Sequence, residues 1–343
     1  MPLVSVVIPS YNHEKYIAQA VQSVFYQSLS DLELIVIDDG SIDRSLEILN
    51  GFQDSRLLVI SQENQGAHAA INRGLGIAQG QYLAILNSDD FFHSIRLEYL
   101  IRTLHNYQDV GLIGSYLQVV DANGNSLGVK HGYRDLNPWT LPYPERSFRQ
   151  GEDLRVVQLT ENFWSTTSNF VFSREWFERT GPFRPLRYVH DWDYVLRMGQ
   201  IAKLLMIPEP LISYRLHSSN TITENLAAMI FELCWILAVH LPQALKTDWF
   251  EAKDQFLRSD QLLHSIYVYG FDRILTLMLL HSISEKPEFA LNILKPDHPF
   301  RKSCLDFIQK QLATNSGSDK ILMRQKNSFS LISNLASRFR GRL

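Results

Sequence analysis

The sequence predicts an α/β protein with a mostly parallel sheet flanked by helices, followed by a helical C-terminal region. The first observation is that short apolar, β-branched runs alternate with segments of helical spacing from Leu3 to Leu86. The second is that several of these runs stop at clusters of polar residues. The third is that the chain beyond Thr221 has helical patterning almost throughout.

The N-terminal half predicts strand, helix, strand, helix, strand, helix, strand, in that order. The expected strands are Leu3–Ile8, Leu32–Ile37, Leu57–Ile60 and Tyr82–Leu86. The expected helices are Lys15–Gln27, a helix with Asp43 near its start, and Ala67–Ala78, which Gly80 would cap at its C-terminus. Such alternation favours parallel strands joined by crossover helices.

The pattern weakens between about residues 128 and 165, which we expect to form a long loop or insertion. A strand at Ser168–Phe172, a helix at Asp191–Gly199 and a strand at Leu204–Ile207 are expected next. A boundary near residue 222 then divides the chain into domains 1–222 and 223–343. The apolar run Leu226–Leu241 is shorter than the roughly 20 residues that span a bilayer, so a buried helix is favoured over a monotopic membrane contact.

Composition excludes several classes of protein. The 343 residues carry 33 basic and 36 acidic side chains, a formal charge of -3, which gives no general attraction to nucleic acid. Two cysteines exclude a disulfide scaffold and favour a reducing compartment. No targeting segment precedes the first strand, so a cytoplasmic location is expected.

Two acidic clusters follow predicted strands. Asp39 comes after the second strand, and Asp89 with Asp90 after the fourth. In open parallel sheets ligands bind beyond the carboxyl ends of strands, so these clusters are expected in one site. Carboxylate oxygens suit Mg²⁺ or Mn²⁺, which stabilise a diphosphate leaving group. The alternative for each cluster is a solvated turn or a helix cap.

Two further groups carry candidate chemistry. Asp191, beside Asp193 at the start of a predicted helix, is a candidate general base, and its alternative role is a helix cap. Arg215 and His217 follow an apolar segment and are candidates for phosphate and metal binding. Their alternative is an ordinary surface strand end.

Together these segments resemble the family 2 glycosyltransferases, whose nucleotide-binding domain has the GT-A fold. The resemblance covers roughly residues 3–218 and rests on ordered motifs. These are Val4–Asn12, Glu33–Asp43, Asn64–Gly66 with Ala69–Gly74, Asn87–Asp90 and His190–Asp193. It implies an inverting transfer of a single sugar from a nucleoside-diphosphate sugar, preferably a UDP- or dTDP-sugar, with Mn²⁺ or Mg²⁺ as cofactor. It also implies a glycan or lipid-linked acceptor in cell-surface polysaccharide or glycoconjugate synthesis.

The resemblance also implies roles for individual residues. Those expected to bind the nucleotide sugar are Pro9, Tyr11, Glu14, Asp39, Asn72, Ser88, Asp89 and Arg215. Of these, Asp39 would contact the base and Asn72 would face the nucleotide. The metal candidates are Asp89, Asp90 and His217, and Asp191 would be the general base.

Three positions depart from the family pattern. Asn87 stands where the metal motif often has Asp, which leaves the choice between Asp89 and Asp90 open. Ile71 stands where the third motif often has Arg, and His190 where Glu often precedes the base. The departures at Asn87 and Ile71 motivate an alternative function, a nucleotide-sugar-binding protein that has lost turnover and acts as an assembly partner.

Other enzyme classes lack support. The first strand is followed by Pro9–Asn12 rather than the glycine-rich turn of dinucleotide-binding enzymes, and no phosphate-loop motif occurs. A glycosidase would use paired carboxylates but has no need of nucleotide motifs. The segment from Lys320 is basic and amphipathic, a composition compatible with peripheral contact with an anionic membrane, although a solvated tail is the favoured interpretation.

Overall fold

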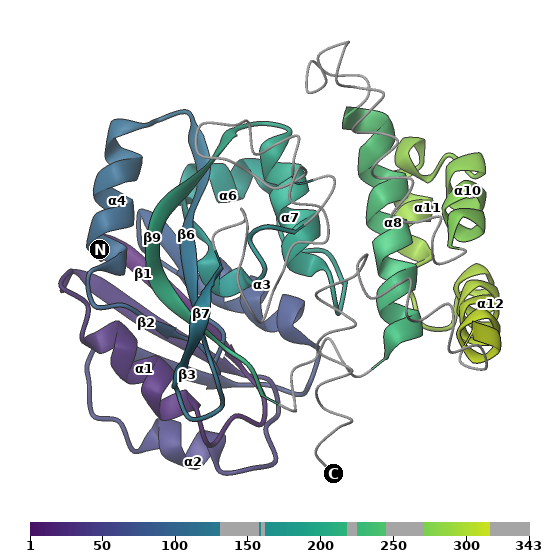
Figure 1. Cartoon of the computed structure of the whole chain (residues 1–343). Coiled ribbons are helices and arrows are strands. Elements are labelled where there is room, and N and C mark those ends of the chain that lie inside the picture. The colour runs from purple at the N-terminus through teal and green to yellow at the C-terminus, as the bar shows by residue number, and fades with distance from the viewer. Residues whose placement is uncertain (131–157, 159–161, 218–224, 245–270, 316–343) are drawn as a thin grey trace.

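A computed structural model describes residues 1–130, 158, 162–217, 225–244 and 271–315 of the chain (Figure 1). The strands are β1 (Val4–Ser10), β2 (Leu32–Asp38), β3 (Leu57–Ser61), β4 (Tyr82–Ile85), β5 (Phe91–Phe92), β6 (Val110–Val120), β7 (Ser126–Lys130), β8 (Val171–Ser173) and β9 (Lys203–Arg215). The α-helices are α1 (Ile17–Phe25), α2 (Ser45–Asn50), α3 (Ala67–Ile77), α4 (Arg96–Asn106), α6 (Arg174–Thr180), α7 (His190–Gly199), α8 (Leu226–Ala244), α10 (Asp272–Leu280), α11 (Pro287–Asn292) and α12 (Pro299–Asn315). Two short 3₁₀ helices lie at Thr167–Asn169 and Ile283–Glu285.

One sheet organises the N-terminal part, with strand order β3-β2-β1-β4-β8-β6-β9-β5 and β7 paired to β6. Strands β1 to β4 are mutually parallel where they pair, and β6 is parallel to β9. β8 is antiparallel to both β4 and β6. Two successive reversals restore the direction, so β9 ends at the same edge of the sheet as β1 and β4. The predicted α/β class is confirmed.

Alternate side chains of β1 point to opposite faces of the sheet, as the two-residue period of a strand requires. Val6 and Ile8 pack in a core with residues of α1 and α4, whereas Val7 packs in a second core with residues of α3 and α7. All three side chains are fully buried. Burial on both faces explains why β1 is a continuous apolar run rather than an alternating one.

The structure corrects three details of the sequence analysis. The strand expected at Ser168–Phe172 begins at Val171, because Ser168 and Asn169 lie in a 3₁₀ helix. Gly80 is not the cap of α3, because the helix ends at Ile77 with Ala78 in the C-cap position. Gly80 instead lies against β1, where a Cβ atom would come within 2.4 Å of the backbone nitrogen of Ser5. The last strand is also much longer than the expected Leu204–Ile207, and it runs on to Arg215.

The region expected to be a loop from about residue 128 begins inside β7, which ends at Lys130. The remainder of that region is described only at Gln158 and from Asn162 onward. The predicted boundary at residue 222 and the basic segment from Lys320 both lie outside the described residues.

The described C-terminal residues are predominantly helical, and α8 stands between the sheet domain and α10, α11 and α12 (Figure 1). Within the described residues, α8 is the one helix long and apolar enough to cross a bilayer. However, 78% of its apolar window is buried inside the protein. A core helix has the same composition, so this helix is weak support for a membrane span.

Candidate functional site

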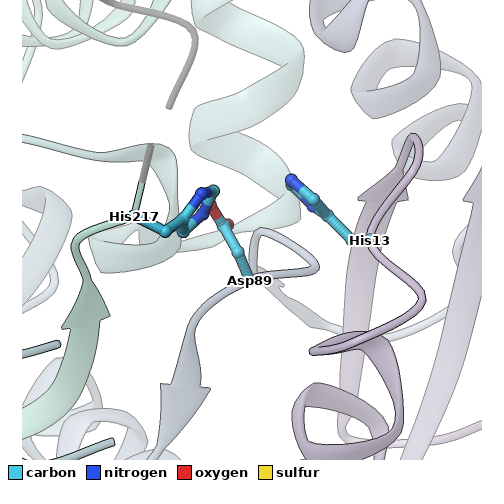
Figure 2. Close-up of side chains that lie close together, drawn as sticks. All are labelled: His13, Asp89 and His217. Atoms are coloured by element: carbon cyan, nitrogen blue, oxygen red, sulfur yellow. The ribbon is translucent and has the colours of Figure 1, made fainter. Parts of the chain in front are cut away.

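The candidate site forms where β1, β4 and β9 end at one edge of the sheet. His13 comes from the loop after β1, Asp89 from the turn after β4, and His217 from the residues after β9. Figure 2 shows the three side chains converging from these separate segments. One candidate ligand atom from each lies within 4.8 Å of the other two. Segments more than 200 positions apart along the chain therefore supply one cluster.

His217 is buried and held within the cluster. Its Nε2 lies 2.9 Å from Oδ2 of Asp89. Its ring is tilted against the Tyr16 ring at a centroid distance of 4.9 Å, and it meets the His13 ring edge-on at 5.6 Å. The alternative interpretation of the sequence, in which Arg215 and His217 lie at an exposed strand end, is wrong. His217 is 5% exposed and Arg215 is 2% exposed.

His13 is the site residue that sequence reasoning missed. Its Nδ1 lies 2.6 Å from Oγ of Ser88, which leaves Nε2 for another partner. Its backbone N–H donates to Ser45 Oγ at 3.0 Å, so the start of α2 fixes the loop. The only available signal was its position just after the first predicted strand, beside Tyr11. Loop conformation decides whether such a residue points into the site, and no spacing encodes that.

Two imidazoles and one carboxylate form a donor set that fits a divalent cation. Imidazole nitrogen suits transition metals, and carboxylate oxygen suits Mn²⁺ and Mg²⁺. Burial opposes ionisation of Asp89, but the hydrogen bond with His217 and the positive potential of His13 and His217 outweigh it and lower the pKa of Asp89. A carboxylate that stays ionised is a suitable metal ligand.

Asp89 and Asp90 are adjacent in sequence but differ in their surroundings. Both oxygens of Asp90 accept hydrogen bonds inside the protein, Oδ1 from the Arg215 backbone N–H at 2.9 Å and Oδ2 from Ser168 Oγ at 2.5 Å. Burial and the neighbouring charge of Asp89 raise the pKa of Asp90 well above its ordinary value. The metal role expected for Asp90 thus competes with a structural role, and Asp89 is the better placed ligand.

Arg215, expected to bind phosphate, is committed to the protein itself. Its Nε donates to the Asp89 carbonyl at 2.8 Å, and another guanidinium nitrogen donates to Gln19 Oε1 at 2.6 Å. The guanidinium also lies 4.8 Å from the centre of the Tyr16 ring. In this arrangement Arg215 supports the backbone that presents Asp89, while phosphate contact stays a prediction.

Asp39, the residue expected to contact the base, joins two loops at the end of β2. Its Oδ1 accepts hydrogen bonds from Gln62 Nε2 at 2.7 Å and from the Gln65 N–H at 2.9 Å. Its Oδ2 accepts from the Gly66 N–H at 2.8 Å. These partners are far from Asp39 in sequence, so the carboxylate is not simply closing its own turn. A carboxylate offers about four acceptor sites, so capacity for a base remains.

Asn72, expected to face the nucleotide, binds the loop before α7. Its Nδ2 donates to the Phe183 carbonyl and its Oδ1 accepts from the Phe183 N–H, both at 2.8 Å. This paired contact fixes α3 to the segment that leads toward Asp191. Nucleotide contact by Asn72 stays a prediction.

The remaining expected nucleotide residues follow β1 or β4. Pro9 is buried within β1, and Tyr11 is exposed just beyond it. Glu14 accepts a hydrogen bond from the Arg44 N–H at 3.0 Å. Ser88 is buried and paired with His13. These residues therefore surround the same edge of the sheet as the His13–Asp89–His217 cluster.

Asp191 lies in the first turn of α7, which begins at His190. The helix has Val189 in the N-cap position and no capping side chain, so neither Asp191 nor Asp193 is its N-cap. Asp191 Oδ2 accepts from Asn162 Nδ2 at 2.8 Å, and the side chain is 8% exposed. Burial raises the pKa of Tyr214, and the charges of Asp90, Asp89 and Asp191 raise it further. The segment that follows Asn162 leads to Thr166, whose Oγ1 lies 3.4 Å from Oδ2 of Asp90, the neighbour of Asp89. One short segment therefore contacts both Asp191 and the turn that carries Asp89.

Two of the three departures from the family pattern, Asn87 and Ile71, have structural explanations. The Asn87 amide donates to Thr166 Oγ1 at 2.9 Å and accepts from Thr167 Oγ1 at 2.8 Å, so it ties the turn after β4 to the segment before β8. Ile71 is fully buried in the core between α3 and the sheet. An arginine at this position would have to be accommodated in that apolar core.

Comparison with known proteins agrees with this geometry. The family model for glycosyl transferase family 2 matches residues 5–181. An uncharacterized glycosyltransferase of Nostoc sp., alr2836, is 29% identical over 225 residues, which cover 63% of this chain and 66% of that relative. The chain therefore spans slightly less than two thirds of that relative's length.

Solved structures share the fold at low sequence identity. S. aureus TarS 1-349 in complex with UDP-GlcNAc has a TM-score of 0.57 and 17% identity, over 99% of this chain and 92% of that one. The mannosyltransferase PcManGT from Pyrobaculum calidifontis, in complex with GDP-Man and Mn²⁺, has a TM-score of 0.54 and 15% identity, over 100% and 88%. Similarity at this level supports the GT-A-like architecture.

Proposed function

The chain belongs to glycosyltransferase family 2, and on that premise we propose that it transfers a single sugar from a nucleoside-diphosphate sugar to a hydroxyl group. We further propose that the transfer inverts the anomeric carbon and uses a divalent cation. The observation that carries this proposal is the convergence of His13, Asp89 and His217 at the edge where parallel strands end. The segment from Asn162 to Thr166 links Asp191 to the turn that carries Asp89.

The donor in this proposal is a UDP- or dTDP-sugar. The structural relatives TarS and PcManGT were solved with UDP-GlcNAc and with GDP-Man and Mn²⁺, and a nucleoside diphosphate is common to both ligands. A screen for the donor should therefore contain sugars linked to UDP and to GDP. Asp39, with remaining acceptor capacity at the end of β2, is the group we assign to the base.

The cation in this proposal is Mn²⁺ or Mg²⁺, held by Asp89, His217 and His13. Two imidazole ligands favour Mn²⁺ of the two, because Mg²⁺ prefers oxygen donors. A bound cation would supply positive charge opposite the diphosphate leaving group. Arg215, through its bonds to the Asp89 and Asp90 region, keeps the Asp89 carboxylate at the cluster.

Asp191 is the general base in this proposal. The acceptor oxygen attacks the anomeric carbon, the bond from that carbon to the diphosphate oxygen breaks, and the acceptor proton passes to the Asp191 carboxylate. One displacement inverts the configuration. Asn162, which donates to Oδ2 of Asp191, and the Trp192 N–H, which donates to Oδ1, orient the carboxylate for this task.

The acceptor in this proposal is a hydroxyl of a glycan or lipid-linked sugar, in the synthesis of a cell-surface polysaccharide or glycoconjugate. Its expected place is the cytoplasm, with peripheral contact at the inner face of the membrane through the basic segment from Lys320. The acceptor class follows from the family and not from any residue contact, so it is tested separately from the donor.

The test begins with a thermal-shift screen of UDP-, dTDP- and GDP-sugars, each with and without Mn²⁺, since a ligand of the folded state raises the melting temperature. Release of nucleoside diphosphate from the best donor is then measured with a pool of glycan and lipid-linked acceptors. Asp191→Asn should lower kcat by roughly 100- to 10,000-fold, because a general base contributes about that factor, while donor affinity is kept.

Asp109→Asn is the matched control, because Asp109 is an exposed partner of Lys203 on the surface. It should retain wild-type turnover. Donor binding without turnover for any donor and acceptor would favour the alternative of a binding protein acting as an assembly partner. Full turnover by Asp191→Asn would remove Asp191 from the mechanism.

A further inference from the structure

The first helix of the C-terminal region, α8, is tied by two buried polar contacts to the segment that carries Asp191. Both tying side chains, Glu232 and His240, are 1% exposed. They are eight positions apart, about 12 Å along a helix. Buried polar side chains in an otherwise apolar helix are costly unless they are fully bonded, so their partners indicate what they do.

Glu232 holds the residues that lead into α7. Its Oε1 accepts from the Arg187 N–H at 3.0 Å and its Oε2 accepts from the Tyr188 N–H at 2.8 Å. Burial raises the pKa of Glu232, and the backbone bonds oppose that rise. Glu232 therefore helps to fix the chain just before the first turn of α7, a helix that has no capping side chain of its own.

His240 holds α7 two positions beyond Asp191. Its Nε2 lies 2.9 Å from Oδ1 of Asp193, and Gln200 Nε2 lies 3.1 Å from its Nδ1. The NH₂ group of Gln200 can only donate, so Nδ1 of His240 accepts, and Nε2 carries the proton that is donated to Asp193. Burial lowers the pKa of His240, which agrees with a neutral ring. Arg184 and Arg197 also bind Asp193, at 2.8 and 3.0 Å.

Apolar contacts join the same two parts. Leu186, Val189 and Leu196 belong to one buried cluster with the apolar residues of α8, and Trp192 packs against that cluster. The Trp192 ring also donates from Nε1 to the Gln158 carbonyl at 2.6 Å. The residues on both sides of Asp191 are therefore anchored to α8. Val189 and Trp192 contact the buried cluster, and Asp193 binds His240.

We infer that Glu232 and His240 are positioning residues, and that α8 sets the orientation of Asp191 for proton transfer. This inference rests on the proposed function of Asp191. The C-terminal region is then part of the catalytic apparatus, although neither residue touches substrate. Apolar packing alone would hold the helices together, whereas paired bonds to backbone N–H groups and to Asp193 fix the position of α7 along and around its axis.

The experiment compares Glu232→Gln, His240→Ala and His240→Gln in the full chain. A glutamine at 232 keeps the shape but presents an N–H group to one of the two backbone donors. We expect kcat to fall by roughly tenfold or more, because small displacements of a reacting group cost about that factor. The KM for donor should stay within about twofold, since Asp39 and Ser88, which we assign to the nucleotide, follow β2 and β4 and do not bind α8. Glutamine at 240 keeps a donor for Asp193 and should recover most of the kcat lost in His240→Ala.

Ile308→Ala is the control for stability, because Ile308 is fully buried in the same cluster, on α12, and is not among the residues that tie α8 to α7. It should lower the melting temperature and leave kcat near that of the wild type. An equal loss of kcat in Ile308→Ala and Glu232→Gln would overturn the inference, as would wild-type kcat in both Glu232→Gln and His240→Ala.

Amide hydrogen exchange gives a second readout that does not require turnover. Glu232→Gln should speed exchange at Arg187 and Tyr188 and through the first turn of α7, by about tenfold or more, while Ile308→Ala should not do so selectively. If the wild-type protein turns over no donor, the proposed function fails. The amide hydrogen exchange experiment still tests whether α8 holds residues 187–193 in place. Unchanged exchange at residues 187–193 would overturn the tie itself.

Discussion

At the scale of single residues, neighbours in sequence have different roles because their surroundings differ. Asp90 is surrounded by internal donors and has a raised pKa, whereas Asp89 faces two imidazoles and has a lowered pKa. The same holds for Asp191 and Asp193. Asp191 retains slight exposure next to Asn162, while Asp193 is fully buried among Arg184, Arg197 and His240. Sequence motifs identify such pairs but do not assign the roles within them.

His13 supplies a prediction for the metal cluster. His13→Ala should weaken Mn²⁺ binding by about 10- to 100-fold, because a three-residue donor set loses one ligand. Binding is measured by titrating the chain with Mn²⁺ and following free Mn²⁺ by electron paramagnetic resonance. His93→Ala is the matched control, since His93 is exposed and contributes only backbone contacts in the described structure. Equal Mn²⁺ affinity in both variants would exclude His13 as a ligand.

Asp193 supplies a prediction for pH dependence. Burial acts to raise the pKa of Asp193, but Arg197, His240 and Arg184 together lower it far below its ordinary value. The unfolded chain binds the proton near pH 3.9, so Asp193 contributes its full stability above that pH and loses it as the pH falls toward the folded pKa.

Asp193→Asn should therefore reduce the free energy of unfolding by about 3 kcal/mol at pH 7, because it removes the buried carboxylate that pairs with the partly buried Arg184 and Arg197. The difference from the wild type should be the same at pH 5 and should shrink at pH 3.5. Urea unfolding at the three pH values measures it. A difference that stays constant down to pH 3.5 would contradict the lowered pKa.

At the scale of elements, close approach of backbones explains features that propensity does not. Gly80, which follows α3, lies against Val4 and Ser5 of β1. The Ser5 hydroxyl accepts from the Gly80 N–H at 2.7 Å and donates to Glu33 on β2. A glycine here lets the chain enter β4 directly beside β1. The sequence indicated a glycine after a helix, and only the packing of β1 shows why it is needed.

Gly80→Ala should lower the free energy of unfolding by about 1–3 kcal/mol, because the new Cβ would meet backbone atoms that cannot rotate away. Gly76→Ala is its counterpart, since Gly76 lies inside α3 and a Cβ atom added there would have no neighbouring atom within 4 Å. Alanine there should raise stability by about 0.5–1 kcal/mol. Urea unfolding of both variants gives the comparison, and the same sign for both would refute this account.

At the scale of the whole molecule, the sheet domain and the C-terminal helices share a buried cluster rather than a simple linker. That cluster contains Leu186 and Val189 from the first part and most apolar residues of α8 from the second. The apolar composition of α8 is thus explained by burial within the protein. We assign the proposed membrane contact to the basic segment from Lys320.

That segment supplies the last prediction. Its basic residues are Lys320, Arg324, Lys326, Arg338, Arg340 and Arg342. Each basic residue near an anionic surface contributes about 1 kcal/mol, so deletion of residues after Ser316 should strongly reduce binding to vesicles that contain phosphatidylserine. Co-sedimentation measures it, with neutral phosphatidylcholine vesicles as the control. Undiminished binding of the shortened chain would show that membrane contact lies elsewhere.

The sequence by itself determined the α/β class, the order of the first seven elements and the clusters that follow β2 and β4. These features depend on local periodicity and on the rule that parallel strands end at one edge of a sheet. It also indicated Asp191 and His217, but local spacing was equally consistent with a helix-cap role for Asp191 and favoured a surface strand end for His217.

Only the tertiary structure decided which of these residues meet. His13 joins the cluster because the loop after β1 folds over the turn after β4, and His217 because two antiparallel pairings bring β9 back parallel to β1. Glu232 and His240 lie outside the family match and gain meaning only through their bonds to the α7 segment. Contacts between residues that are distant along the chain depend on the packing of all intervening elements, and no local pattern contains that information.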